Sequence, residues 1–230
     1  MEPGATPYPS PNHGPRRNGL RPGLIVLHYT GMASTAAALE RLCAPEHEVS
    51  AHYLLGRDGR LYALVDEAAR AWHAGHGAWG GQGDVNSRSI GVELDNAGDH
   101  PFAAAQIDRL EALMAGIMAR WKIAPRGVIA HSDLAPARKA DPGPRFDWQR
   151  LARRGLSVWP EAGEAPASAA RFLDAAQHFG YPVEAGAEAV LTAFRLRFRP
   201  HATGPLAPAD MGAITDLAAR FGVDRGGADT

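Results

Sequence analysis

Three short apolar segments constrain the fold of this chain more than any other feature of its sequence. They are L-I-V-L-H-Y at 24–29, S-I-G-V-E-L at 89–94 and G-V-I-A at 127–130. Continuous apolar runs of this length are typical of strands that are buried on both faces of a sheet. Apolar residues at helical spacing over 103–121 predict a long amphipathic helix. We therefore expect the three segments to be central strands.

A helix and a hairpin are expected after the first of these strands. Ser34 has the side chain of a helix cap and precedes the apolar pattern T-A-A-A-L-E. Asp58-Gly59 stands between the apolar runs 51–56 and 60–65, which is a strong signal for a β-hairpin. The sheet is therefore expected to gain two further strands here.

The composition changes along the chain and divides it into four segments. Residues 1–23 are rich in proline and glycine and are expected to form an extended arm. Residues 24–155 hold the strands and are expected to form the main domain. A linker is expected over 156–167, and a small helical domain over 168–230. The helical domain shows three helical patterns, at about 168–179, 186–197 and 208–222.

Charge and cysteine content exclude some classes of protein. The net charge is -1 and the isoelectric point is about 6.8, so a nucleic acid is not expected as a partner. Cys43 is the single cysteine, which excludes an intramolecular disulfide. No segment approaches the roughly 20 apolar residues of a membrane span, and the N-terminus lacks a secretory pattern. We expect a cytoplasmic protein, and a periplasmic one if a leader has been removed.

Three polar residues are expected near the ends of the central strands. His28 ends the first strand, His131 directly follows the last, and Asp141 lies in the loop A-H-S-D-L-A-P-A-R-K-A-D-P-G that comes next. A catalytic zinc needs three protein ligands and one open position, and nitrogen and carboxylate oxygen suit it. Either histidine alone is more often a hydrogen-bonding group that is half-buried. The spacing by itself is therefore only compatible with a zinc site.

Two further residues have the chemistry of a hydrolytic site. Glu93 lies in an otherwise apolar strand, where an ionised carboxylate is costly unless it is paired or functional. It is either a general base beside a zinc ion or a partner in a structural ion pair. Lys139 is two residues before Asp141 and either stabilises an oxyanion or is a solvated loop lysine.

Five blocks of sequence together resemble a known family. They are L-I-V-L-H-Y-T, V-S-A-H-Y-L-L-G-R-D-G-R-L-Y, A-W-H-A-G, N-S-R-S-I-G-V-E-L-D-N and the loop that contains His131 and Asp141. In this order they resemble the zinc-dependent N-acetylmuramoyl-L-alanine amidases, which are related to peptidoglycan recognition proteins and phage lysozyme-type amidases. The resemblance covers roughly residues 20–155.

The resemblance implies an α/β fold with a mixed central β-sheet flanked by helices, and one zinc ion in a groove. It implies that His28, His131 and Asp141 are the zinc ligands, that Glu93 is the base and that Lys139 polarises the tetrahedral intermediate. The family cleaves the amide between the lactyl group of N-acetylmuramic acid and L-alanine of the stem peptide.

Residues that flank the five blocks are expected to contact the substrate. They are Tyr53, Trp72, His73, Asn86 and Arg138. Arg138 has the charge to pair with a carboxylate of the stem peptide. His52 is expected to be structural, because three ligands already fill the zinc site.

The small C-terminal helical domain resembles the three-helix peptidoglycan-binding module of some family members in position and size. Three functions remain open from the sequence: an enzyme that recycles 1,6-anhydro-muropeptides in the cytosol, a periplasmic enzyme that acts on intact peptidoglycan, and a non-catalytic recognition module. The recognition module is least favoured, because a suitable residue stands at each of the three ligand positions and Glu93 stands at the position of the base. The oligomeric state is not predicted.

Overall fold

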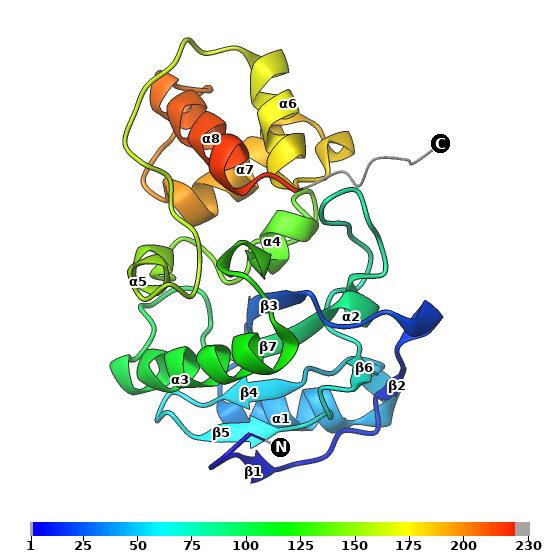
Figure 1. Ribbon diagram of the computed structural model, residues 1–230. Coiled ribbons are helices and arrows are strands. Elements are labelled where there is room, and N and C mark those ends of the chain that lie inside the picture. The colour runs from blue at the N-terminus through cyan, green and yellow to red at the C-terminus, as the bar shows by residue number, and fades with distance from the viewer. Residues whose placement is uncertain (1, 224–230) are drawn as a thin grey trace.

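The computed structural model describes residues 2–223 and is built around a six-stranded sheet, most of whose strands are seen one below another from the middle to the bottom of Figure 1. The strand order is β1-β5-β4-β7-β3-β8. The bounds of these strands are β1 (Thr6–Pro7), β3 (Leu24–Tyr29), β4 (Tyr53–Leu55), β5 (Leu61–Ala63), β7 (Ser89–Leu94) and β8 (Val128–Ala130). Two short strands, β2 (His13–Pro15) and β6 (Ala69–Ala71), pair separately.

The sheet is mixed, as expected. Strand β3 pairs in parallel with both β7 and β8, and β4 is parallel to β7. Strands β4 and β5 are antiparallel and form the expected hairpin. In its turn, the Asp58 carboxylate accepts a hydrogen bond from the Arg60 amide at 2.9 Å. The carboxyl ends of β3, β7 and β8 therefore meet at one edge.

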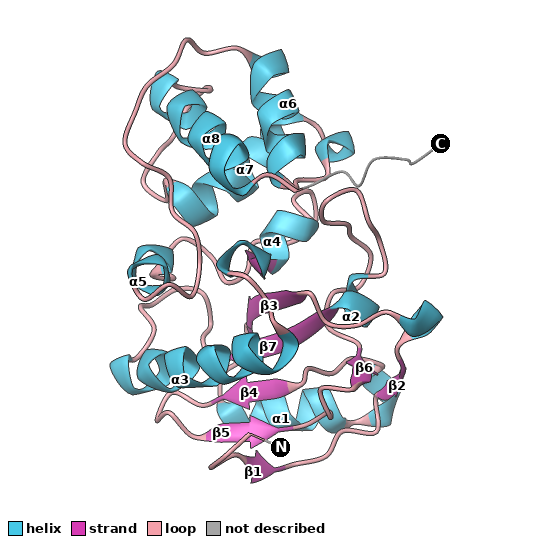
Figure 2. Cartoon of the chain, in the orientation of Figure 1, coloured by secondary structure: helices cyan, strands magenta, loops and turns pink. Residues whose placement is uncertain are grey.

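Eight α-helices and four short 3-10 helices lie in the described part of the chain (Figure 2). The α-helices are α1 (Thr35–Cys43), α2 (Val85–Arg88), α3 (Ala104–Trp121), α4 (His131–Leu134), α5 (Trp148–Arg153), α6 (Ala169–Phe179), α7 (Ala187–Phe198) and α8 (Pro208–Phe221). The 3-10 helices span Arg17–Gly19, Pro45–His47, Pro125–Gly127 and Val183–Ala185. Helix α1 is capped as predicted, since the Ser34 hydroxyl accepts a hydrogen bond from the Ala37 amide.

The side chains of β3 alternate between two hydrophobic clusters. Ile25 and Leu27 pack with the buried face of α3. Leu24 and Val26 pack in a second cluster that includes the apolar side chains of α6, α7 and α8. Successive strand residues point to opposite faces, so this alternation means that β3 is covered on both sides. The unbroken apolar run of this strand follows from that double burial.

The three C-terminal helices gather at one end of the molecule, beside α4 (Figure 1). They pack directly on the sheet domain, because Phe172 and Phe194 share a cluster with Ile129 of β8. In the expected linker, Val158 is buried in the same cluster. The last residues of the expected helical domain, 224–230, lie outside the described residues.

The N-terminal segment is extended and is fixed along the sheet domain. Strand β1 pairs with β5, and β2 pairs with β6. The Arg16 guanidinium donates hydrogen bonds to the carbonyl groups of Glu67, Ser87 and Ser89, among others. Within residues 2–223, no helix is long and apolar enough to cross a lipid bilayer.

Candidate active site

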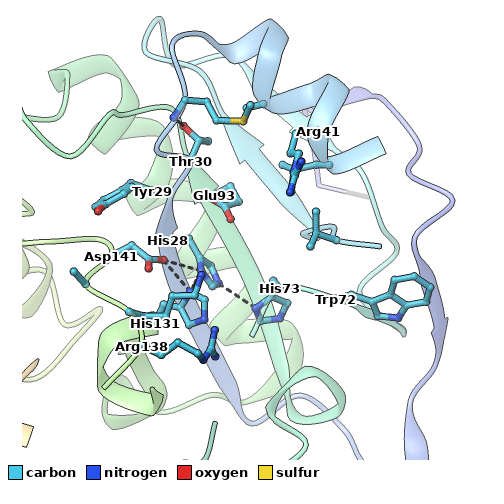
Figure 3. Close-up of a pocket in the computed structure, with 16 residues that line it drawn as sticks. His28, Tyr29, Thr30, Arg41, Trp72, His73, Glu93, His131, Arg138 and Asp141 are labelled. Carbon is cyan, nitrogen blue, oxygen red and sulfur yellow. Dashed lines mark hydrogen bonds and ion pairs between the residues drawn. The ribbon is translucent and has the colours of Figure 1, made fainter. Parts of the chain in front are cut away.

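The side chains of His28, His131 and Asp141 converge at the carboxyl edge of the sheet (Figure 3). His28 lies near the end of β3, His131 is the first residue of α4 directly after β8, and Asp141 lies in the following loop. His28 Nδ1 is 2.9 Å from His131 Nδ1, and each nitrogen is 3.0 Å from Asp141 Oδ2. All three residues are buried. The predicted trio is therefore brought together in space.

The outer hydrogen bond of His131 decides which of its ring nitrogens carries the proton. His131 Nε2 is 3.1 Å from the carbonyl oxygen of Ala74, which can only accept. Nε2 must therefore be the protonated nitrogen, and Nδ1 presents a lone pair toward His28 and Asp141.

A longer chain of hydrogen bonds gives the same result for His28. The Ser89 hydroxyl donates to the carbonyl oxygen of Val85 at 2.6 Å, so it accepts from His73 Nε2 at 3.1 Å. His73 Nδ1 is then free to accept a hydrogen bond from His28 Nε2 at 3.0 Å. This leaves a lone pair on His28 Nδ1, the atom that faces the centre of the site.

Three acceptor atoms consequently face one another with no proton between them. Such a group repels itself unless a cation lies among its members. Four ligands at about 2.0–2.1 Å from a zinc ion are separated by about 3.3 Å, and the observed separations of 2.9–3.0 Å are close to this. Two imidazoles and one carboxylate are therefore a donor set and a geometry that fit a metal ion.

Burial keeps His28 and His73 neutral. Burial first, and the neighbouring His131 second, lower the pKa of His28 to about 4. Burial also lowers the pKa of His73 well below its ordinary value. A neutral imidazole is the form that binds a metal, so protons do not compete with a metal ion for His28 near neutral pH.

Glu93 lies beside this trio with an unusual carboxyl group. It is the direct neighbour of His28 across β3 and β7, and it lines the same pocket. Its Oε2 atom is buried and has no hydrogen-bond partner within residues 2–223. Burial, followed by the charge of Asp141, raises the pKa of Glu93 to about 8. A carboxyl group with such a pKa can both accept and release a proton near neutral pH.

The trio and Glu93 form the floor of an open pocket of about 510 Å³. Its walls carry the predicted Lys139, Arg138, Trp72 and His73. They also carry residues that the sequence analysis did not identify, namely Tyr29, Thr30, Met32 and Arg41. The first two directly follow His28, so their position at a strand end was a usable signal. Arg41 lies on a helix face whose sequence pattern gave no signal of a binding site.

The structure does not bring Tyr53 and Asn86 to this pocket. The Tyr53 hydroxyl donates to Glu67 Oε1 at 2.7 Å, and its side chain lines a separate cavity beside Trp121. Asn86 Oδ1 accepts hydrogen bonds from the backbone amides of His73 and Ala74 at 3.0 and 2.8 Å. Asn86 therefore fixes the backbone at His73, and its own side chain is buried away from the pocket.

His52 and Gly91 support His73 from the side of the sheet. Burial lowers the pKa of His52 to about 3, and its Nδ1 accepts a hydrogen bond from the Gly91 amide at 2.9 Å. This is a structural environment, as expected. A Cβ atom on Gly91 would lie 2.4 Å from the His73 ring, so only glycine leaves room for that ring.

A mixed sheet, a trio at its carboxyl edge that could hold a metal ion and an adjacent carboxyl group are typical of metal-dependent hydrolases with an α/β fold. The chain belongs to the N-acetylmuramoyl-L-alanine amidase family, whose sequence profile matches residues 18–144. That range contains the trio, Glu93 and Lys139.

Similar proteins extend the match beyond this range. The N-acetylmuramoyl-L-alanine amidase AmiD of Escherichia coli is 36% identical over 87% of this chain and 84% of its own length. The 1,6-anhydro-N-acetylmuramyl-L-alanine amidase AmpD of the same organism is 32% identical over 64% of this chain and 90% of its own.

Two solved structures align with most of this chain. A complex of AmiD from E. coli with the substrate anhydro-N-acetylmuramic acid-L-Ala-D-gamma-Glu-L-Lys aligns with a TM-score of 0.81, at 35% identity, over 90% of this chain and 93% of that one. AmpDH3 from Pseudomonas aeruginosa in complex with anhydromuramic pentapeptide aligns with a TM-score of 0.81, at 28% identity, over 90% and 95%.

Proposed function

We propose that this chain is a zinc-dependent N-acetylmuramoyl-L-alanine amidase that acts on muropeptides, with 1,6-anhydro-muropeptides as its preferred substrates. The observation that carries the proposal is the convergence of His28 Nδ1, His131 Nδ1 and Asp141 Oδ2 beside Glu93, whose Oε2 atom has no hydrogen-bond partner among the described residues. The preference for anhydro sugars is supported by the ligands of the two aligned complexes.

His28, His131 and Asp141 would hold the zinc ion. When bound, zinc acts as a Lewis acid and lowers the pKa of a water molecule toward neutrality. His73 and the Ala74 carbonyl keep the two imidazoles in the tautomer that the ion requires.

Glu93 would move the proton of the reaction. It accepts a proton from the attacking water while the oxygen of that water forms a bond to the lactyl carbonyl carbon. It then donates the proton to the amine of L-alanine as the carbon–nitrogen bond breaks. In the metal-free protein the pKa of this carboxyl group is raised to about 8, which is close enough to neutral pH for one group to accept and then release a proton.

Cationic side chains around the pocket suit an anionic peptide substrate. Lys139 would stabilise the negative charge that develops on the carbonyl oxygen. Arg138 is exposed and would pair with a stem-peptide carboxylate, and Arg41 adds a second positive charge on the opposite wall. Trp72 offers an aromatic surface for packing against the substrate.

The cellular location is a separate part of the proposal. We propose the cytoplasm, where soluble wall fragments would be the substrate, and keep as the alternative a periplasmic enzyme that acts on intact peptidoglycan. Fractionation of the native cells, with immunodetection of this chain, decides between them.

The test is a digestion assay on anhydro-muramyl tripeptide and on intact sacculi, read by mass spectrometry. We expect free peptide from the soluble fragment, loss of that product with a chelator, and recovery when zinc is added back. Release from sacculi at a similar rate would support the alternative. No cleavage of either substrate by the zinc-loaded protein would contradict the proposed function.

A further inference from the structure

A buried carboxylate joins the active-site segment to the C-terminal helices. Asp133 is two residues after His131 and is completely buried. It accepts hydrogen bonds from three donors: the Ala130 amide at 2.9 Å, the Tyr181 hydroxyl at 2.8 Å and the Arg197 guanidinium at 2.6 Å. Two of these donors come from beyond the expected linker, from the C-terminal helical part of the chain.

Arg197 contacts this segment at both of its ends. A second nitrogen of its guanidinium donates to the carbonyl oxygen of Val128, where β8 begins, at 2.9 Å, and to the Ser157 hydroxyl at 3.2 Å. Its guanidinium carbon lies 4.4 Å from the centre of the Trp148 ring and 4.7 Å from that of Phe198. Arg197 is thus held in one position and spans β8 and the turn that follows it.

The segment between these two attachment points carries one predicted metal ligand and touches another. His131 lies between Val128 and Asp133. The next amide, of Ser132, donates a hydrogen bond to the carbonyl oxygen of Asp141 at 3.0 Å. A displacement of Asp133 would therefore move His131 directly and would move Asp141 through this backbone contact.

A buried ion pair is a poor source of stability, because removing two charges from water costs about as much as their attraction returns. Its directional bonds are better suited to fixing a geometry, and metal ligands must be placed within about 0.5 Å. We propose that Arg197 of the C-terminal helices is a positioning residue for the metal ligands His131 and Asp141. The C-terminal helices thereby complete the active site of the sheet domain. This inference rests on the proposed zinc function.

The test compares Arg197→Met with a matched variant on the same helix. Arg195 is also buried and also pairs with a buried aspartate, Asp210, but its hydrogen-bond partners lie within the C-terminal helical part. Zinc dissociation constants would be measured by competition with a chromophoric chelator. The thermal midpoint of the metal-free protein, and kcat and KM at saturating zinc, would be measured on the same samples.

We expect Arg197→Met to weaken zinc binding about 10–100-fold and to lower kcat with little change in KM. Arg195→Met should lower the thermal midpoint by a similar amount but leave zinc affinity within about twofold. Equal zinc affinity in Arg197→Met and the unmodified protein would overturn the inference. Equal losses of affinity in both variants would overturn it too, because they would indicate general destabilisation.

Tyr181→Phe covers the case in which Arg197→Met does not fold. It removes one hydrogen bond to Asp133 and keeps the packed ring. We expect a smaller loss of zinc affinity than in Arg197→Met, again with a lower kcat and little change in KM. Unchanged zinc affinity would contradict the inference. If the unmodified protein binds zinc but cleaves no muropeptide, the proposed function fails while the comparison of zinc affinities still tests the positioning role.

Discussion

At the scale of single residues, the site depends on where protons lie. In His131, the hydrogen bond to the Ala74 carbonyl places the proton on the outer ring nitrogen. In His28, the hydrogen bonds that run through His73 and Ser89 to the Val85 carbonyl do the same. On the inner side, Glu93 is half-buried, and its Oε2 atom is buried with no hydrogen-bond partner among the described residues. Its carboxyl group therefore costs stability in exchange for a pKa that suits proton transfer.

Glu93→Gln should separate this cost from the catalytic role. We expect zinc binding to be retained and the rate of amide cleavage to fall by about 10²–10⁴, the usual contribution of a general base. Steady-state kinetics and a zinc titration on the same variant check both. Full activity in the glutamine variant would show that another group moves the proton.

The same substitution should stabilise the metal-free protein in a pH-dependent way. Folding raises the pKa of Glu93 from 4.5 to about 8, so the folded state binds its proton more tightly than the unfolded state does. Stability is therefore lost as the pH rises from about 4.5 to about 8 and stays low above that. We expect Glu93→Gln to gain about 1–3 kcal/mol at pH 8 and almost nothing at pH 4. Thermal unfolding in chelator across this range measures the difference.

Ser89→Ala tests the hydrogen-bond chain behind His28. Without the hydroxyl, His73 loses the acceptor of its Nε2 proton and no longer needs to accept from His28. We expect zinc affinity to fall about tenfold, measured by chelator competition. Ser10→Ala is the control, because this buried hydroxyl also donates to a backbone carbonyl at 2.6 Å but lies in the N-terminal segment. An equal effect of both variants on zinc affinity would argue against a role for the hydrogen bonds that link Ser89, His73 and His28.

At the scale of elements, strand β7 shows how the sheet makes room for the site. Its residues Glu93 and Gly91 lie on one face, and the His73 ring fills the space that a side chain at Gly91 would take. The strand therefore carries a carboxyl group and a gap for an imidazole two residues apart. Both are needed at the same edge as His28.

Gly91→Ala should damage the fold and the metal site together. The added methyl group would overlap the His73 ring, so we expect a loss of about 1–3 kcal/mol in unfolding free energy and weaker zinc binding. Gly14→Ala in β2 is the control, since no heavy atom would lie within 4 Å of its Cβ. Denaturant unfolding and chelator competition on both variants give the comparison. Unchanged zinc binding in Gly91→Ala would mean that the ring adjusts without cost.

At the scale of the whole molecule, the C-terminal helices are part of the core. They cover the face of β3 and β8 that α3 does not reach, through a cluster that includes Val26 and Ile129. Two partly separate cores therefore meet along β3. Without the C-terminal helices this face of β3 and β8 would be uncovered, while α1 would still pack on Leu54 of β4.

Removal of residues 168–230 should consequently expose a large apolar surface. We expect the shortened protein to lose cooperative unfolding or to aggregate, and to bind the hydrophobic dye ANS far more strongly than the full chain. A monomeric product with the original thermal midpoint would show that the sheet domain folds alone.

The sequence predicted the elements well because their periodicities are local. The strands at 24–29 and 89–94 and the helix capped by Ser34 are confirmed at their predicted positions. The trio was also within reach, because side chains at the ends of parallel strands must lie close together. The roles of these residues remain predictions, which the experiments above test.

Other features could not be read from the sequence, because they join residues that no local pattern connects. Arg197 and Asp133 are separated by 64 positions, and nothing near Arg197 indicates a buried partner. Tyr53 and His73 both stand in motifs of the resembled family, but only the packing shows that one faces Glu67 and the other His28.

The position of β3 between two cores has a consequence for how a bound metal would leave. Its amides are hydrogen-bonded on both sides by β7 and β8, so they should be among the slowest in the protein to exchange with deuterium. Asp141, by contrast, lies in a loop whose neighbours Arg138 and Ala140 are exposed. Metal release would then begin at Asp141, while β3 keeps its hydrogen bonds to both neighbouring strands. The rate of metal release would follow the opening of the Asp141 loop instead of global unfolding.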